Sequence, residues 1–424
     1  MPEYLSPGVY VEEVPSSVKP IAGVSTSTAA FLGLLPTGAK EAGPVLVTSW
    51  TQFTKVFGDF VADVTPSPPP GPTAGPTKAP TPSPTSAATP GEAPAPTPAA
   101  GPTPAPTAAP IGDADARRYL AHAVYGFFNN GGSRCYVVRC TSGAHADALK
   151  ALARIDGISI VAAPGIVDDS VRSAVVAHCE NNPGRFAILD GPAQVGDKLD
   201  SLTKIAAGGG GVMPAKSTVA AWYFPWIRVF DPAVKGPVDV PPSGHVAGVY
   251  ARVDTERGVH KAPANEVIRG ALGVTQLLSK AEQDGLNPKG VNCIRVLNDN
   301  VLVWGARTVG GDDNADLKYI NVRRTLLFLR KSIEAGTQWV VFEPNDPALW
   351  QKITRNVDAF LTNVWRGGAL FGATPQQAFY VRCDASTNPP ELCDIGQVVT
   401  EIGVALVRPA EFVIFRISQS APAA

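Results

Sequence analysis

The stretch that most constrains this fold lies near the end of the chain, where residues 411–419 read EFVIFRISQ. Its centre is apolar on both faces of a strand, a pattern typical of a strand buried between two neighbours. Residues 4–14 (YLSPGVYVEEV) form a second short β-favouring segment near the other end. Because unpaired strand edges readily pair with other chains, these two segments predict strands donated to other copies of the protein. The sequence therefore favours a polymer over a soluble enzyme.

We expect each donated strand to form main-chain hydrogen bonds with a neighbour's strand, such as the one predicted at residues 398–407. Its large apolar side chains would then be buried, each contributing roughly 1.5–3 kcal/mol. The residues assigned to these contacts are Val9, Tyr10, Val11 and Glu12 in the N-terminal arm and Phe412, Val413, Ile414, Phe415 and Arg416 in the C-terminal arm.

Composition and charge exclude several classes of function. A chain of 424 residues is long enough for two or three domains. Its formal net charge of −1 provides no basic surface for nucleic acid. No apolar run reaches the roughly 18 residues of a membrane span, and the start lacks the pattern of a signal peptide, so we expect synthesis in the cytoplasm. The six cysteines are scattered outside any CxxC pair and are expected to be buried thiols.

A proline-rich segment at residues 66–110 interrupts the folded pattern. Such a composition cannot bury a core, which predicts a polyproline-like or disordered excursion on the surface. The flanks at 48–60 and 114–128 both read as folded, and the second has the spacing of a helix. We therefore expect an insertion within a domain, spanning residues 62–111. It is either a passive loop or a surface that meets an outer partner.

The part that follows the insertion alternates between strands and helices. Strands are predicted at 134–140, 158–162 and 186–189, and helices at 144–152 and 169–180. This alternation predicts a mainly parallel, helix-covered sheet. Further along, the pattern indicates a helix at 199–207 and one aromatic-rich strand at 219–230.

The last third predicts a domain of helices and strands. A helix is expected to follow the N-cap residue Asp346 and Pro347 and to end at Gly367-Gly368. The other predicted elements are helices at 265–268 and 317–333 and strands at 291–297, 301–308, 339–343, 379–383 and 398–407.

Motifs for catalysis or cofactor binding are weak throughout. Asp190, His245 and a later serine occur in an order that chance readily produces, and no serine lies in a GxSxG turn. The run 208–211 (GGGG) lacks the Lys-Ser/Thr of a phosphate-binding loop. The five histidines lack paired metal-ligand spacing. We expect no enzyme activity, no cofactor and no metal.

The helix predicted at 317–333 carries basic residues that the spacing places on one face. They are Lys318, Arg323, Arg324, Arg330 and Lys331. One interpretation is a solvated helix face, and the other is an electrostatic docking surface for an acidic partner.

Several segments, taken in order, resemble those of contractile tail sheath proteins, and most closely the sheaths of phage-tail-like contractile injection systems. They are YLSPGVYVEEV at 4–14, YARVDTERGVHKAPANEVIRG at 250–270, GVNCIRV at 290–296, VWGARTV at 303–309, YINVRRTLLFLRKSIEAGTQWVVFEPN at 319–345 and PAEFVIFRISQ at 409–419. The resemblance covers most of the chain outside the proline-rich segment, which is no fixed part of the family pattern.

The resemblance implies a subunit that stacks as helical rings around an inner tube and contracts to drive that tube through a target envelope. The implied fold is α/β and α+β, with an N-terminal arm (1–20), a subtilisin-like sheath domain without protease activity (21–260), a C-terminal sheath domain (261–409) and a C-terminal arm (410–424). The implied partners are further copies of the chain, the inner tube protein, and baseplate and tail-terminator or cap proteins, without nucleic acid or membrane insertion.

Assembly would take place in the bacterial cytoplasm, and the product would be a phage-tail-like particle. The basic helix face would then hold the sheath on the tube. Two alternatives remain open: an active subtilisin-like hydrolase, and a soluble module whose proline-rich segment is a ligand for aromatic-lined grooves.

Overall fold

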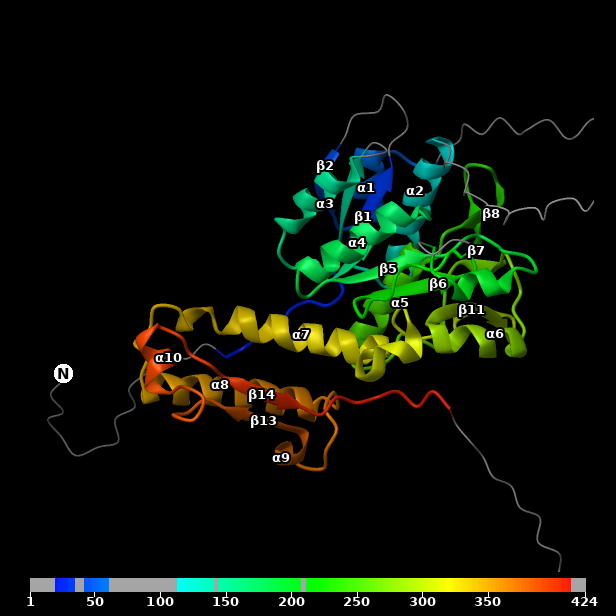
Figure 1. Ribbon diagram of the computed structural model, residues 1–424. Helices are drawn as coiled ribbons and strands as arrows, with labels where there is room; N and C mark the ends of the chain where they lie inside the picture. The colour runs from blue at the N-terminus through cyan, green and yellow to red at the C-terminus, as the bar shows by residue number, and fades with distance from the viewer. Residues whose placement is uncertain (1–19, 35–41, 61–112, 141–143, 207–210, 413–424) are drawn as a thin grey trace, which may run out of the picture.

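The computed structural model describes residues 20–34, 42–60, 113–140, 144–206 and 211–412. These residues form a large α/β body and a smaller C-terminal lobe, and the long helix α7 (Ile320–Gly336) extends from the body along the lobe (Figure 1). The fold is therefore a mixed α/β fold of more than one part, as predicted. The proline-rich segment at 66–110 lies outside the described residues.

A nine-stranded sheet forms the centre of the body, in the order β2-β3-β1-β4-β5-β6-β11-β12-β9. The strands from β3 to β11 in this order are parallel, whereas β2, β12 and β9 pair antiparallel at the edges. Their bounds are β1 (Ala29–Leu34), β2 (Ala42–Val47), β3 (Cys135–Cys140), β4 (Ile160–Ala162), β5 (Phe186–Asp190), β6 (Ala220–Phe224), β9 (Glu266–Val267), β11 (Val291–Leu297) and β12 (Asn300–Val303). The apolar runs FAILD of β5 and AAWYF of β6 are buried along their whole length, as expected for a parallel sheet covered on both faces.

Two hydrophobic cores lie on opposite faces of this sheet. Successive residues of β1 alternate between them, so that Phe31 packs in the first core and Leu32 in the second. Helices α1 (Trp50–Phe57), α2 (Asp113–Asn129) and α5 (Ser243–Glu256) cover the first face. Helices α3 (His145–Ala153), α4 (Asp169–Asn181) and α6 (Lys280–Leu286) cover the second, with the 3-10 turns η1 (Leu199–Thr203) and η3 (Asn287–Lys289) nearby.

Helix α5 is buried from Ser243 to Val253 and packs closely against α2. Glycine permits this approach, because a Cβ at Gly244 would lie 2.2 Å from the Cα of Ala123. Likewise, a Cβ at Gly248 would lie 2.5 Å from the carbonyl oxygen of Phe127. A helix surrounded by protein has no polar stripe, which is why the periodicity of the sequence does not reveal it.

The single strand predicted at 219–230 is wrong, because the chain forms two strands in two different sheets. Strand β6 ends at Phe224, and β7 (Ile227–Asp231) begins after Pro225. Proline has no N–H to donate to a ladder, so it favours a break there. Strand β7 is the centre of a three-stranded antiparallel sheet with β8 (Gly236–Val240) and β10 (Ala271–Val274).

The C-terminal lobe packs around a third hydrophobic core, to which the second half of α7 contributes. Asp346 caps α8 (Pro347–Arg366) by accepting a hydrogen bond from the N–H of Leu349 at 2.7 Å, and the helix ends at Gly367, as predicted. The other elements of the lobe are η5 (Gln338–Val340), α9 (Pro375–Ala378), β13 (Phe379–Arg382), α10 (Pro390–Asp394) and β14 (Glu401–Val404). Ile21 of the N-terminal part also belongs to this core and packs against Gly336.

The strand predicted at 339–343 is wrong. The short 3-10 turn η5 follows α7, and the next residues, Val341 and Phe342, are exposed. Phe342 has a φ of 71°, which an extended strand does not allow. The apolar sequence WVVF therefore forms a turn at the tip of the lobe.

Other predicted elements of the second half differ in type or length. Residues 265–268 contain strand β9 instead of a helix, since the chain pairs with β12 at the edge of the sheet. The helix predicted at 199–207 is reduced to η1, and the strand predicted at 301–308 ends at Val303. The chain then passes close to β11 at Gly305, where a Cβ would lie 2.8 Å from the Cα of Asn292.

The domain boundary expected at residue 260 falls inside the large sheet. Strands β9, β11 and β12 follow that residue, yet all three belong to the nine-stranded sheet. The body therefore continues through the 3-10 segment η4 (Gly311–Leu317), which leads into α7.

Candidate assembly site

The sheet of the C-terminal lobe has only two strands in the described part of the chain, so each strand has one edge without a partner strand there. Its two strands, β13 and β14, are antiparallel, with Val381 opposite Ile402 and Phe379 opposite Val404. The N–H of Ala405 donates to the carbonyl oxygen of Ala378 at 2.8 Å. This bond shows which residues of β14 direct their main-chain groups toward β13 and which direct them away. The N–H and C=O groups of Ile402 and Val404 therefore point away from β13, toward a free edge.

One face of this strand pair is packed and the other is open. Phe379, Val381, Ile402 and Val404 face the third core. On the opposite face, Tyr380 is exposed and Arg382 forms an ion pair with Glu401. A two-stranded sheet is only marginally stable by itself, so this lobe gains from further strands on its free edge.

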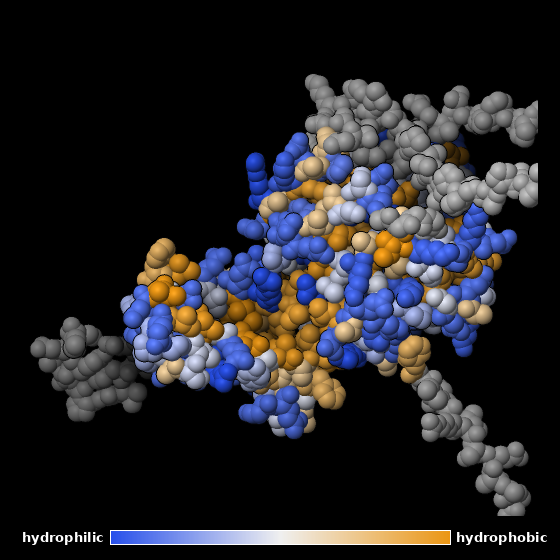
Figure 2. Space-filling view, in the orientation of Figure 1, coloured by the Kyte–Doolittle hydropathy of each residue, from blue (hydrophilic) through white to orange (hydrophobic). Residues whose placement is uncertain are grey.

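Apolar surface lies beside the free edge. Figure 2 shows it in the hollow between α7 and the β13–β14 pair. The partly buried apolar side chains that pack against the third core include Phe328, Ile333, Trp339, Val340, Ile402, Val404 and Leu406. An added strand with apolar side chains on alternate positions would cover part of this surface.

The predicted arm residues cannot be placed on this surface from the structure. Val9, Tyr10, Val11, Glu12, Val413, Ile414, Phe415 and Arg416 lie outside the described residues. Phe412 is described and its side chain is 71% exposed. The acceptor strand predicted at 398–407 is shorter than expected, because regular pairing is confined to β14 (Glu401–Val404). Strand donation thus stays a prediction.

A buried ion pair joins α7 to the body. Nη1 of Arg324 donates to Oδ1 of Asp254 at 2.8 Å, and Nη2 donates to Oδ2 at 2.6 Å. Both side chains are 4% exposed. The hydroxyl of Thr26 also donates to this carboxylate, and its carbonyl oxygen accepts from Nη2 of Arg324 at 3.0 Å. Three segments that lie far apart in the sequence meet at this one pair.

Two tyrosines complete the surroundings of Arg324. Its guanidinium lies over the ring of Tyr250, 4.7 Å from the centroid, and the hydroxyls of Tyr250 and Tyr223 are 2.7 Å apart. Burial alone would lower the pKa of Arg324, but the carboxylate of Asp254 outweighs it and raises the pKa. The arginine is therefore a fixed, compensated buried cation.

The basic helix face is only partly formed. The surface position predicted for Arg324 is wrong, because its side chain is buried and forms an ion pair with Asp254. Lys318 lies 3.1 Å from Asp312, and Lys331 lies 3.5 Å from Glu334, so both have acidic neighbours. Arg323 is half-buried and Arg330 is exposed. Docking through these four residues stays a prediction.

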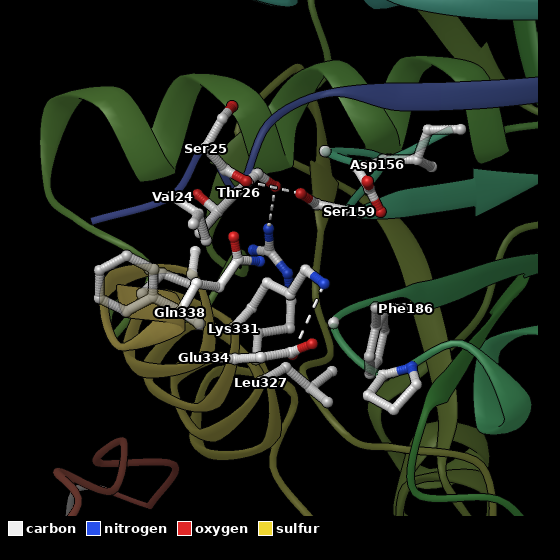
Figure 3. A pocket seen from close by; sticks show the side chains of 18 residues that line it. Val24, Ser25, Thr26, Asp156, Ser159, Phe186, Leu327, Lys331, Glu334 and Gln338 are labelled. Atoms are coloured by element: carbon white, nitrogen blue, oxygen red, sulfur yellow. Dashed lines mark hydrogen bonds and ion pairs between the residues drawn. The ribbon is translucent and has the colours of Figure 1, made fainter. Parts of the chain in front are cut away.

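A cavity of about 400 Å³ opens beside the ion pair (Figure 3). It lies between the segment Val24–Thr26, the loops before β4 and β5, and one side of α7. Its apolar wall includes Phe186 and Leu327, and its polar side chains include Asp156 and Lys331. The hydroxyl of Thr26, which also lines the cavity, donates to the carboxylate of Asp254 that pairs with Arg324.

The weak catalytic order noted in the sequence does not form a triad. Asp190 is buried and accepts from the hydroxyl of Ser243 at 2.7 Å and from the N–H of Gly165 at 3.0 Å. His245 packs against Gly126 of α2, and its Nδ1 has no partner among the described residues. These side chains fix the start of α5 and are closed to substrate.

Two further kinds of feature were expected to be missing, a metal-ligand cluster and a membrane-spanning helix. No group of three or more potential ligands lies together there. No helix that the structure describes has both the length and the apolar character needed to cross a bilayer. Five of the six cysteines are buried, as expected, and Cys393 is partly exposed.

Three buried histidines make the fold sensitive to acid. Burial lowers the pKa of His122, that of His178 to about 4 and that of His245 to about 3. These rings are neutral in the folded state and protonate on unfolding, so their stabilising contribution is complete above pH about 6.5 and is lost as the pH falls. Asp190 opposes them, because burial raises its pKa to about 6 and its contribution is lost as the pH rises through that value.

We expect the free energy of unfolding to decrease between pH 6.5 and about 4.5, since three histidines outweigh Asp190. His178→Gln keeps an acceptor for Nη1 of Arg185, which lies 2.6 Å from the ring Nε2. The variant should reduce the slope of the free energy of unfolding against pH by up to about 1.4 kcal/mol per pH unit, which is the value for the uptake of one proton. Urea unfolding at a series of pH values measures this slope, and equal slopes for variant and wild type would contradict the assignment.

Comparison with known families matches two family models to the chain. The phage tail sheath protein central domain matches residues 140–309, and the phage tail sheath C-terminal domain matches residues 312–420. Together they cover more than half of the chain. The boundary between them lies between β12 and α7, close to the point where the structure leaves the large sheet.

Two solved structures are similar along nearly the whole chain. One is the sheath complex of PVC, an extracellular contractile injection system, in its contracted state, with 26% identity, coverage of 99% of each chain and a TM-score of 0.72. The other is the helical sheath of the anti-feeding prophage (AFP) in its contracted state, with 27% identity, coverage of 98% of this chain and 99% of that chain, and a TM-score of 0.69.

A curated relative is the tail sheath protein of Vibrio phage KVP40, which is 30% identical over 181 residues. That match covers 42% of this chain and 25% of the relative. The chain spans about half or less of the length of the curated relatives it matches most strongly.

Proposed function

Because this chain belongs to the phage tail sheath family, we propose that it is the structural subunit of a contractile sheath. It polymerises as helical stacked rings around an inner tube and contracts to drive the tube through a target envelope. The observation that carries this proposal is the full-length similarity to two sheaths of contractile particles in the contracted state.

Strand donation is the proposed means of assembly. The free edge of β14 offers the main-chain groups of Ile402 and Val404, and the apolar hollow beside it suits the alternating side chains of residues 412–415. Residues 9–12 of another copy are proposed to extend the same sheet. Each additional strand would add several hydrogen bonds, worth about 0.5–1.5 kcal/mol each, and bury large side chains.

The proposed role needs no enzymatic step. The relatives are sheath proteins, and the described residues bring no nucleophile, base or metal-ligand group together in the cavity. An extended sleeve would store energy in the contacts between subunits and release it by forming better ones. A subtilisin-like fold of the body, without protease activity, is part of this proposal.

The proposed partners are further copies of the chain, an inner tube protein, and baseplate and cap proteins. Contact with the tube through Lys318, Arg323, Arg330 and Lys331 is the weakest part, because two of these side chains already have acidic neighbours. Assembly in the bacterial cytoplasm is likewise proposed, with a phage-tail-like particle as the product.

Negative-stain microscopy of the purified full-length protein tests this function directly. Wild type should form sleeves of regular diameter. A variant that ends at Phe412 lacks all but the first three residues of the C-terminal arm and keeps every contact described for the lobe, so it should stay folded and form no sleeves. Long sleeves from the truncated protein would contradict C-terminal strand donation, and a discrete small species from wild type would contradict the sheath assignment in favour of a soluble binding module.

A further inference from the structure

One carboxylate holds the chain in place at the start of the C-terminal arm. Oε1 of Glu411 accepts from Nε of Arg307 at 2.9 Å and from Nδ2 of Asn287 at 2.7 Å. Oε2 accepts from Nη2 of Arg307 at 2.8 Å and from the hydroxyl of Tyr319 at 3.0 Å. All three partners precede α7 and belong to the body, so the last described part of the chain ends there and not on the lobe.

The body orients Arg307 independently of Glu411. The side chain of Arg307 is 3% exposed. Its Nη1 lies 3.0 Å from Oδ1 of Asp312 and donates to the carbonyl oxygen of Asn287 at 3.3 Å, while its backbone N–H donates to Oδ1 of Asn292 at 2.7 Å. The two remaining donors, Nε and Nη2, form a fork that matches a carboxylate in bidentate geometry. The slot is therefore built for one carboxylate.

The carboxylate in this slot stays charged. Burial would raise the pKa of Glu411, but the hydrogen bonds from Arg307 and Asn287 outweigh it and hold the pKa below its usual value. Removal of the carboxylate would leave Arg307 buried with only Asp312, whose side chain is 48% exposed, as its acidic partner. Hydrogen bonds between charged groups of this kind are stronger than those between neutral groups.

The chain that leads to Glu411 crosses from the lobe to the body. The carbonyl oxygen of Ala405 accepts from the N–H of Phe371 in the lobe at 2.7 Å. The carbonyl oxygen of Val407 then accepts from Nδ2 of Asn321, at the start of α7, at 3.2 Å. Arg408 forms an exposed ion pair with Asp316, and Glu411 completes the crossing. The residues after Glu411 consequently start from the body.

We propose that Glu411 is the anchor of the C-terminal arm, the residue that fixes where the arm leaves the subunit and transmits any pull on the arm to the large sheet of the body. This inference rests on the proposed sheath function. It adds a positioning residue that acts through the arm, without itself pairing with the neighbouring copy. A donated strand with a fixed origin reaches the edge of a neighbour at a smaller entropic cost than one that swings freely.

The test compares Glu411→Gln with Asp316→Asn in the full-length protein. Glutamine keeps the size of the side chain but loses the charge, whereas Asp316→Asn removes the exposed partner of Arg408 on the same stretch, a pair expected to contribute little. Limited digestion with a protease of broad specificity, below the assembly concentration, should cleave residues 407–412 about tenfold faster in Glu411→Gln, with α7 and the β13–β14 pair cleaved as in wild type. The concentration needed for sleeves should rise about tenfold. Asp316→Asn should match wild type in both measurements.

A milder variant provides a second test in case Glu411→Gln misfolds. Tyr319→Phe removes only the hydroxyl that donates to Oε2, so a folded protein with an intermediate increase in the rate of proteolysis is expected. Proteolysis of residues 407–412 at the wild-type rate in Glu411→Gln, or sleeve formation at the wild-type concentration, would overturn the anchor. Failure of the sheath function itself would instead appear as absence of sleeves from wild type, and the proteolysis measurement would still decide whether Glu411 holds the chain.

Discussion

Asp254→Ala is expected to lower the free energy of unfolding by about 3–5 kcal/mol, because it leaves a buried arginine without its partner. Arg324 is 4% exposed, and both carboxylate oxygens of Asp254 accept from its guanidinium. The substitution also removes the acceptor of the Thr26 hydroxyl. The loss would loosen α7 from the body and release the N-terminal part at the same point. Chemical denaturation of variant and wild type, with equal m-values, measures the effect.

The double variant Asp254→Leu with Arg324→Met is the matched control. Replacing both members of a buried ion pair by apolar side chains of similar volume is often neutral or stabilising. We therefore expect the double variant to recover most of the stability that Asp254→Ala loses. If the double variant were as unstable as the single one, the loss of stability would come from altered packing between α7 and the body and not from the unpaired charge of Arg324. A single variant within about 1 kcal/mol of wild type would contradict the importance of the pair.

Ile402→Pro is expected to abolish sleeve formation while the subunit stays folded. The N–H of Ile402 points to the free edge of β14, so its removal costs no hydrogen bond within the subunit. Proline deprives an incoming strand of a donor and places its ring where that strand must lie. Negative-stain microscopy and sedimentation measure assembly, and circular dichroism confirms the fold.

Val381→Pro provides a control on the opposite strand. Val381 lies directly across from Ile402, its side chain is also partly buried in the third core, and its N–H points to the outer edge of β13. The two variants should therefore lose similar stability, but only Ile402→Pro should block assembly. Loss of sleeves in Val381→Pro with normal sleeves in Ile402→Pro would indicate that the donated strand pairs with β13 instead of β14.

The sequence predicted those parts of the fold whose period is visible along the chain. The strands and helices from Cys135 to Asp190 alternate clearly, and α8 carries both its N-cap and its terminating glycines. Strand β1 (Ala29–Leu34) and helix α5 were not predicted, because both are surrounded by protein and their apolar residues have no polar side to set the period.

The candidate site was harder to predict, since its decisive contacts join residues far apart. The helical spacing groups Arg324 with the other basic residues on an exposed face of α7. Its burial depends on the ion pair with Asp254, which lies 70 positions away in the sequence. Glu411 was read as part of a donated strand, although Arg307, 104 positions away, fixes its side chain to the body. Helical spacing describes neighbours within a turn and contains no information about such partners.

Helix α7 belongs to two hydrophobic cores at once, with Ile320 and Leu327 in that of the body and Leu329 in that of the lobe. Its 17 residues make a rod about 25 Å long. A tilt of the body by about 20° would carry the far end of such a rod through about 9 Å. In a sleeve, a modest angular change of the body would thus become a large displacement at the far end of α7, with each subunit acting as a lever whose own fold does not change.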